Sequence, residues 1–186
     1  MSMRNLFLLM SFLLLSGCTS TNHDRFLIEP VASATTIKTD ARTISVSTVN
    51  LPTYAKESGI FVQNGAGAIV AIPKADWADD TERAMRLFLV RSLAEISGAQ
   101  VASDPWPLGG VPEAEIRIDV EQMLVDSSNT MRLSGQFSIR RDRVESRNRI
   151  RQFSIAAKAR SNGPADVVAA HGEAWQELAK VIAKAI

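Results

Sequence analysis

The residue with the most distinctive chemistry is Cys18, the only cysteine in the chain. A free thiol in an exported protein is open to oxidation or mispairing, and a single cysteine cannot form a disulfide within one chain. The residues before it carry one cation, Arg4, and then an apolar run from Leu6 to Leu14. A short basic head followed by about ten apolar residues is typical of an export signal. The run is too short to span a bilayer comfortably, since a spanning helix needs about 20 apolar residues.

The tetrad Leu15-Ser16-Gly17-Cys18 resembles the bacterial lipobox. This resemblance implies a diacylated Cys18 thiol, cleavage before Cys18 and acylation of the new amino group. Acyl chains bury roughly 0.8 kcal/mol per CH2, enough in total to hold a protein on a membrane. Residues 1–17 are therefore expected to be a lipoprotein signal peptide, 18–25 a lipidated tether and 26–186 the folded domain. The alternative is an ordinary signal with a chance cysteine.

Composition excludes some functions of the mature chain. Removal of residues 1–17 leaves 169 residues, and because the signal holds one Arg and no acid, 20 Lys plus Arg face 20 Asp plus Glu. A net charge of zero gives no field to attract nucleic acid. The two histidines, His23 and His171, are distant in sequence, so no metal site is expected.

No catalytic or nucleotide-binding motif is present. The chain has no Gly-x-Ser-x-Gly elbow and no His-Glu-x-x-His pair, and Gly65-Ala66-Gly67 lacks the Lys-Ser/Thr of a phosphate loop. We therefore expect no enzyme activity and no cofactor.

The hydrophobic patterns predict an α/β fold: a single domain with a mixed, largely antiparallel sheet and two main helices packed on one face. One helix is expected to open with Trp77-Ala78-Asp79-Asp80-Thr81-Glu82 and to end at Gly98, with Asp79 as cap and Glu82 completing a capping box. The other starts at Gly163-Pro164. Strands are expected at 26–31, 43–49, 60–63, 68–72, 100–102, 115–125, 130–140 and 144–157.

The clearest strand signals lie in the meander from 115 to 157. In its first strand one face should carry Ile116, Ile118, Val120 and Leu124. Residues 140–151 hold six arginines, of which Arg147, Arg149 and Arg151 alternate and so should share one face. One interpretation is a solvated edge that resists aggregation. The other is a contact for anionic lipid headgroups or an acidic partner.

The mature chain resembles the ABC-type transport auxiliary lipoproteins of the PqiC (YmbA) type. The features that carry the resemblance, besides the lipobox, are Val49-Asn50-Leu51-Pro52-Thr53-Tyr54, Gly59-Ile60-Phe61-Val62, Trp77-Ala78-Asp79 and the alanine-rich segment 168–178. The chain departs from the family pattern at Asp80-Thr81, where Pro-Leu is common, and at His171-Gly172.

The resemblance implies a role beside MCE-type transporters, which move lipids between two membranes. The chain would be a non-enzymatic docking or conduit subunit on the periplasmic face of the outer membrane, and Thr19 after the cysteine favours that membrane by resemblance to the enteric sorting rule. Its partners would be a periplasmic MCE-domain protein and its ABC transporter, with phospholipid as possible cargo and a homo-oligomeric ring as possible assembly. Aromatic contact candidates are Tyr54, Trp77 and Trp175, because an acyl conduit needs apolar lining and exposed aromatic clusters are typical of interfaces.

Two further functions remain open at this stage. A structural or assembly lipoprotein that escorts an outer-membrane protein would crosslink to a β-barrel. A periplasmic hydrolase with an unrecognised site would show a deep polar pocket with hydrogen-bonded titratable residues.

Overall fold

The computed structural model describes residues 22–30, 35–142 and 148–186. The first half of the described chain contains β1 (Asp24–Phe26), β2 (Thr43–Asn50), the single turn α2 (Thr53–Lys56), β3 (Gly59–Gln63), β4 (Ile69–Trp77) and α3 (Thr81–Ser97). The second half contains β5 (Gln100–Ser103), β6 (Ala114–Val125), β7 (Thr130–Arg141), β8 (Arg149–Lys158) and α4 (Pro164–Ala185). All eight of these strands belong to one sheet.

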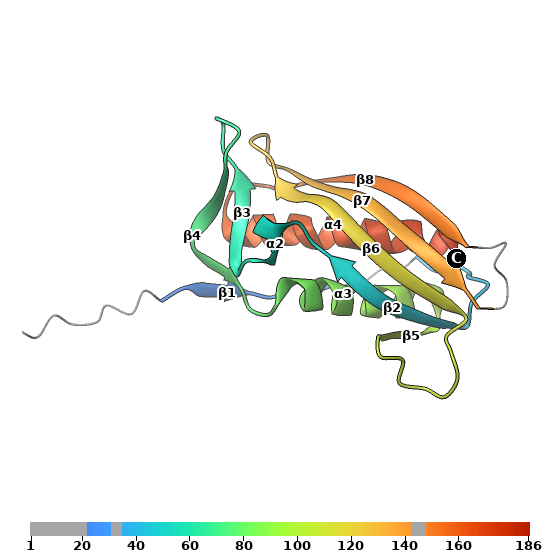
Figure 1. Cartoon of the computed structure of the whole chain (residues 1–186). Coiled ribbons are helices and arrows are strands. Elements are labelled where there is room, and N and C mark those ends of the chain that lie inside the picture. Colours follow the sequence, from blue (N-terminus) through green and yellow to red (C-terminus); the bar gives the residue numbers. More distant parts are fainter. Residues whose placement is uncertain (1–21, 31–34, 143–147) are drawn as a thin grey trace, which may run out of the picture.

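Strand β6 organises the sheet (Figure 1). One edge of β6 pairs antiparallel with β7, which pairs in turn with β8. The opposite edge is shared: β2 runs parallel to the first half of β6, and β3 joins it only where Val62 pairs with Val125. Beyond them, β5 continues from β2, while β4 and then β1 continue from β3. The expected mixed sheet is therefore confirmed, with antiparallel ladders between its longest strands.

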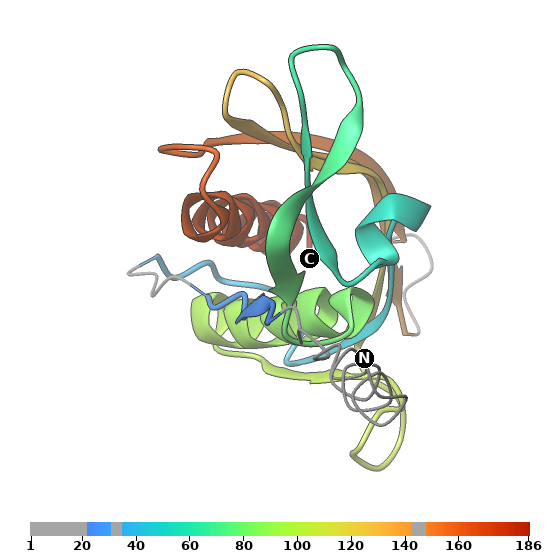
Figure 2. The ribbon, with the colours of Figure 1, turned by 90° about the vertical axis from the view of Figure 1, so that its left-hand side faces the viewer.

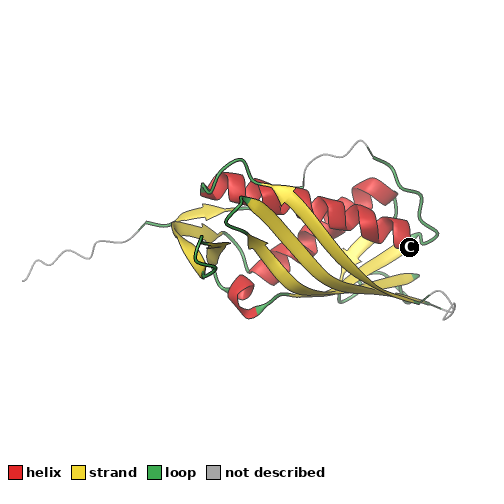
Figure 3. Ribbon diagram, turned by 90° about the horizontal axis from the view of Figure 1, so that it is seen from above, coloured by secondary structure: helices red, strands yellow, loops and turns green. Residues whose placement is uncertain are grey.

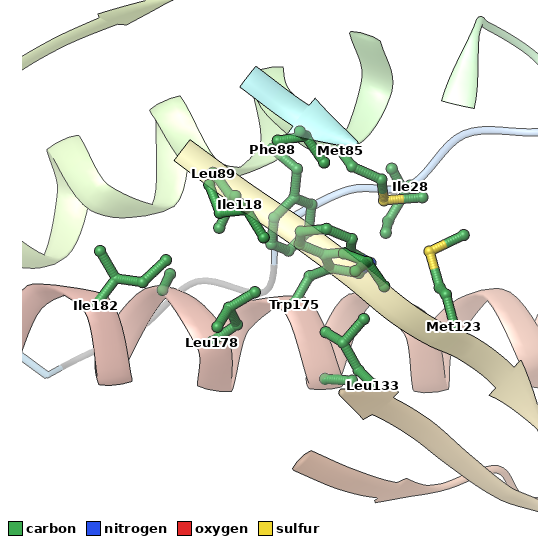
Figure 4. Close-up of a cluster of buried hydrophobic side chains, with 14 of the residues drawn as sticks. Ile28, Met85, Phe88, Leu89, Ile118, Met123, Leu133, Trp175, Leu178 and Ile182 are labelled. Carbon is green, nitrogen blue, oxygen red and sulfur yellow. The ribbon is translucent and has the colours of Figure 1, made fainter. Parts of the chain in front are cut away.

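Helices α3 and α4 lie side by side against one face of this curved sheet, as Figures 2 and 3 show. The strands that face them alternate apolar and polar residues, so each contributes one apolar face to the core. Figure 4 shows Trp175 of α4 and Phe88 of α3 meeting Ile118 of β6 in the centre of this layer. The described helices include none long and apolar enough to cross a membrane.

The ends of α3 correct one prediction and confirm another. Asp80, not Asp79, is the N-cap, because its carboxylate accepts a hydrogen bond from the Arg83 N–H at 2.8 Å. Glu82 does not close a capping box: its carboxylate accepts the Leu51 N–H and pairs with Lys56. Gly98 ends the helix in the left-handed conformation (φ 66°), as predicted.

A β-bulge in β6 overturns the predicted orientation of Leu124. The register to β7 shifts between Val120 and Gln122, which inverts the alternation from there on. Met123 and Val125 consequently enter the core, while Leu124 points to the other face, although it is also buried. Opposite the bulge stands Gly135, at φ 154°.

Boundaries at the two ends of the chain also differ from the prediction. The first strand occupies 24–26 rather than 26–31, because its bounds are set by parallel pairing with Ala75–Trp77 of β4. Trp77 thus closes a strand instead of opening a helix. Strands β3 and β4 form a hairpin, and the Asn64 side chain accepts the N–H groups of Ala66 and Ala68 at its tip. The final predicted strand is present from Arg149 on, and its start at 144–147 lies outside the described residues.

Candidate functional surfaces

An aromatic cluster lies where α2, the β3–β4 hairpin and α4 meet, and it unites two of the predicted contact residues. Tyr54 is half-buried, stands edge-on to Phe61 and accepts the Met123 N–H at 3.0 Å on its hydroxyl oxygen. Trp77 is buried and meets the ring of His171 in a T-shaped contact, with ring centroids 5.3 Å apart. The structure therefore places Tyr54 and Trp77 together, while His171, Phe61 and Met123 join them without a sequence signal that pairs them.

This cluster is a packed part of the core rather than an open site. The space left between its side chains is about 10 Å³, room for about one water molecule and none for an acyl chain. Burial lowers the pKa of His171 to about 4, and its Nδ1 has no hydrogen-bond partner in the described structure. Burial raises the pKa of Tyr54, partly opposed by the Met123 N–H. His171 is thus a neutral core residue.

Trp175 occupies the centre of the helix–sheet interface. Its side chain is 0% exposed, between α3 and the strands that face α4. A residue with no exposed area offers nothing for a partner to touch, so the structure argues against the predicted contact role and gives Trp175 a packing role. Its sequence spacing on an apolar helix face is compatible with both roles, which is why the pattern did not distinguish them.

The alternating arginines lie on β8, which pairs only with β7 and so forms an edge of the described sheet. Arg149 and Arg151 stand opposite Ile139 and Phe137 of β7, so the two side chains share one face, as predicted. Both are exposed. Arg147 lies outside the described residues.

Arg140, which belongs to the same arginine-rich block, and Arg42, which the sequence pattern did not assign to it, lie near this end of the sheet. Arg140 pairs with Glu115 across the β6–β7 ladder, and Arg42 pairs with Glu113 at 3.4 Å. The side-chain hydrogen bond from Arg140 lowers the pKa of Glu115, and the backbone hydrogen bond from Arg42 lowers that of Glu113. The signal that would have located these partners is strand register, which a single sequence does not fix.

The lipobox residues Leu15, Ser16, Gly17 and Cys18 lie outside the described residues, so lipidation stays a prediction. The first described residues are bound to the domain: His23 Nδ1 lies 2.8 Å from a carboxylate oxygen of Asp76, and β1 follows at Asp24. The described chain is therefore held against the domain from His23 on, five positions after Cys18.

Metal and catalytic chemistry find little support in the part of the chain that is described. Its His, Cys, Asp and Glu side chains include no group of three that could hold a metal ion. A surface hollow of about 510 Å³ is lined by charged side chains that include Arg25, Lys56 and Asp79. It lacks a buried pair of hydrogen-bonded titratable groups, which the hydrolase alternative would require.

Comparison with known proteins gives one family and one fold. The family model for the "ABC-type transport auxiliary lipoprotein component" matches residues 26–183. A crystal structure of an uncharacterized protein is similar, with a TM-score of 0.72, 17% identity and coverage of 88% of this chain and 97% of that one. Protein XCC0632 from Xanthomonas campestris, of the family DUF330, gives a TM-score of 0.65, 16% identity and coverage of 86% and 93%. No protein with a curated description matches. At these identities the structural likeness shows the fold alone.

Proposed function

The chain belongs to the family of ABC-type transport auxiliary lipoprotein components, and on this basis we propose that it is the docking or conduit subunit of an MCE-type lipid transport system. Membership confirms the resemblance expected from the sequence and makes the chain an auxiliary lipoprotein of ABC-type transport in the cell envelope. The lipid cargo, the MCE-domain partner and the position on the periplasmic face of the outer membrane belong to the proposal.

The observation that carries the proposal is the extent of the family match. It covers residues 26–183, from the end of β1 to the last turn of α4, so the family fold accounts for nearly all of the described domain. Little remains that could form a separate catalytic unit. The auxiliary role therefore rests on the domain as a whole rather than on a short motif.

The anchor in the proposal is a lipidated Cys18. Asp24, where β1 starts, lies six positions after Cys18, and six extended residues span at most about 20 Å. Such a tether would keep the β1 end of the domain next to the membrane. It is too short for the domain to reach across to a second membrane unaided, which is consistent with a subunit that receives a longer partner.

A conduit made from one copy of the chain is not supported by its surface. The exposed large apolar side chains in the described residues are spread over five separate segments: Leu27, Ile69 with Val70, Leu108 with Val111, Ile150 and Val181. The aromatic cluster around Tyr54 has no room for an acyl chain. A lipid path would therefore need several copies of the chain, as in the proposed homo-oligomeric ring, or a lining supplied by the partner.

The test has two parts. Mass spectrometry of the native protein should find a diacylated, N-acylated residue at Cys18, and the chain should fractionate with the outer membrane. Cys18→Ser should release it, whereas Ser16→Ala, which keeps a small residue before the cleavage point, should not. Affinity purification of the lipidated chain should then recover the MCE-domain protein. Recovery of a β-barrel protein instead would favour the escort function, and recovery of neither would refute the proposal.

A further inference from the structure

The β3–β4 hairpin is the longest stretch of the folded domain without a charged side chain. Residues 59–73 contain no Asp, Glu, Lys, Arg or His over 15 positions, although Asp, Glu, Lys and Arg make up 22% of the whole chain. Figures 1 and 2 show this hairpin projecting from the body of the domain, at the end where β1 lies. A projecting element without charge is suited to a surrounding other than bulk water.

Each face of the hairpin carries an exposed apolar side chain near the tip. Val62 pairs with Val70, and Gln63 with Ile69, so the two pairs point to opposite faces of the ladder. Ile69 is 43% exposed and Val70 is 38% exposed. Strand β7 differs, because polar residues such as Arg132 occupy its outer face. The hairpin therefore lacks a charged face, and both of its faces are covered only by a surrounding that encloses the tip.

The polar groups of the tip are hydrogen-bonded within the tip. The Asn64 side chain accepts the N–H groups of Ala66 and Ala68, and the Asn64 carbonyl accepts the N–H of Gly67. The Asn64 N–H donates to the Ala68 carbonyl at 2.9 Å, and the Gln63 side-chain amide donates to the Gly67 carbonyl at 3.0 Å. Transfer of an amide out of water is costly unless the amide is hydrogen-bonded. A tip with its own hydrogen bonds can therefore enter a medium of low dielectric constant at reduced cost.

The composition of the tip favours lipid over a protein partner. Residues 64–72 are Asn, Gly, Ala, Ile and Val only. The centres of protein interfaces are enriched in Trp, Tyr and Arg, and their rims are polar. An element that lies in a membrane interface needs apolar side chains that reach the boundary with the acyl chains. The tip has such side chains and lacks the aromatic and charged groups that would orient a protein partner.

The expected anchor lies beside the base of the hairpin. Strand β1 pairs with the last residues of β4, with Asp24 opposite Ala75. Cys18 lies six positions before Asp24, at most about 20 Å of extended chain. Ile69 lies six positions before Ala75, roughly 20 Å along the strand. A lipid on Cys18 and the tip of the hairpin can therefore reach the same membrane surface.

We propose that the tip of the β3–β4 hairpin inserts into the interface of the membrane that holds the Cys18 anchor. The partner is a phospholipid surface, and the hairpin is a second contact that fixes how the domain stands on it. Insertion ends at the boundary between headgroups and acyl chains, because the outer edge of β4 before Ala75 has no paired strand in the described sheet and its backbone groups need water. This inference rests on the anchor of the proposed function and adds the orientation of the domain.

The test measures the exposure of the tip on vesicles of phosphatidylethanolamine and phosphatidylglycerol. The lipidated chain with Val70→Cys is treated with a membrane-impermeant maleimide, which does not react with an acylated Cys18, and the acyl-free Cys18→Ser, Val70→Cys chain in buffer gives the reference rate. Labelling should be at least about 5-fold slower on the vesicles. The matched control Val111→Cys replaces an exposed valine in the β5–β6 loop at the other end of the domain, and it should label at the same rate in both states. Adding Ala66→Glu at the tip should remove most of the protection, whereas Gly109→Glu in the β5–β6 loop should leave it unchanged.

The outcomes separate this inference from the proposed function. Equal labelling of position 70 on vesicles and in buffer would refute the insertion, and recovery of the MCE-domain protein would still support the proposed function. Slow labelling on vesicles without recovery of an MCE-domain protein would support the insertion and refute the proposed function.

A second copy of the chain is the competing occupant of the tip. Protection in buffer that increases with the concentration of the acyl-free chain, together with disulfide-linked dimers through position 70, would assign the tip to a second copy and overturn the inference. If mass spectrometry finds Cys18 bare in the native protein, the anchor of the proposed function is lost. The insertion would then be supported only by protection of position 70 when the acyl-free chain binds the same vesicles, and no such protection would refute it.

Discussion

The burial of His171 makes the stability of the domain depend on pH in a defined window. The unfolded chain binds a proton at this residue with a pKa near 6.5, and burial lowers the folded pKa to about 4. Between these values the unfolded state binds more protons than the folded state, so stability must fall as the pH falls. Well above pH 6.5 the imidazole is neutral in both states and contributes almost no pH dependence.

The size of the effect follows from the two pKa values. Protonation of His171 in the unfolded state lowers the free energy of unfolding by about 2 kcal/mol at pH 5. At pH 7.5 it lowers it by less than about 0.1 kcal/mol. Urea unfolding of the wild type at pH 7.5 and pH 5 should show this loss. His171→Gln cannot take up a proton and should lose about 2 kcal/mol less than the wild type over the same interval, whatever its stability at pH 7.5.

The other histidine supplies the control. His23 is exposed beside Asp76, so His23→Gln should leave most of the pH dependence in place. Carboxylates such as Glu113, whose pKa values are lowered, add to the loss of stability at more acidic pH in every variant alike. If His171→Gln and the wild type lose the same stability between pH 7.5 and pH 5, the neutral buried imidazole inferred from the structure is wrong.

Three further predictions concern packing and backbone geometry. Trp175→Ala should cost roughly 3–5 kcal/mol in thermal or urea unfolding, because the side chain is fully buried, whereas Val181→Ala on the same helix, 36% exposed, should cost less than about 1 kcal/mol. A loss below about 1 kcal/mol for Trp175→Ala would contradict its core position. Gly135→Ala should cost roughly 2 kcal/mol or more, because the new Cβ would overlap the Asp119 carbonyl oxygen and lie 2.9 Å from the Val120 Cα; unchanged stability would mean that the bulge is absent. Asp80→Ala should lower the free energy of unfolding by about 1 kcal/mol, because the N-cap hydrogen bond is lost, and a larger loss for Asp79→Ala would reverse the assignment of the cap.

The parts of the fold that sequence periodicity predicts are those in which one interaction dominates. The alternation in β7 places Met131, Leu133 and Phe137 in the core because one sheet face is buried and the other is wet. The same reasoning fails at Leu124, because a bulge shifts the alternation and depends on the partner strand. The first strand is displaced for a similar reason, since only its pairing with β4 sets its bounds.

The candidate surfaces likewise combine features that the sequence predicts with features that depend on strand pairing. The shared face of Arg149 and Arg151 follows from their spacing alone. Their grouping with Arg42 and Arg117 depends on the pairing of β2, β6, β7 and β8, and β2 is distant in sequence from the other three strands. Trp175 shows a second limit of sequence patterns. An apolar helix face is equally compatible with burial in the core and with recognition of a partner, and only the tertiary packing distinguishes the two roles.

The way β3 joins β6 has a consequence for how the domain opens. The β3–β4 hairpin meets the central strand through one residue pair, Val62 and Val125. A segment attached by so few backbone contacts can separate from the rest at a lower free energy than global unfolding requires. Amide protons of Phe61–Gln63 and Ile69–Ala71 should therefore exchange with solvent faster than those in the β6–β7 ladder, so the hairpin can open separately from the longest strands of the sheet.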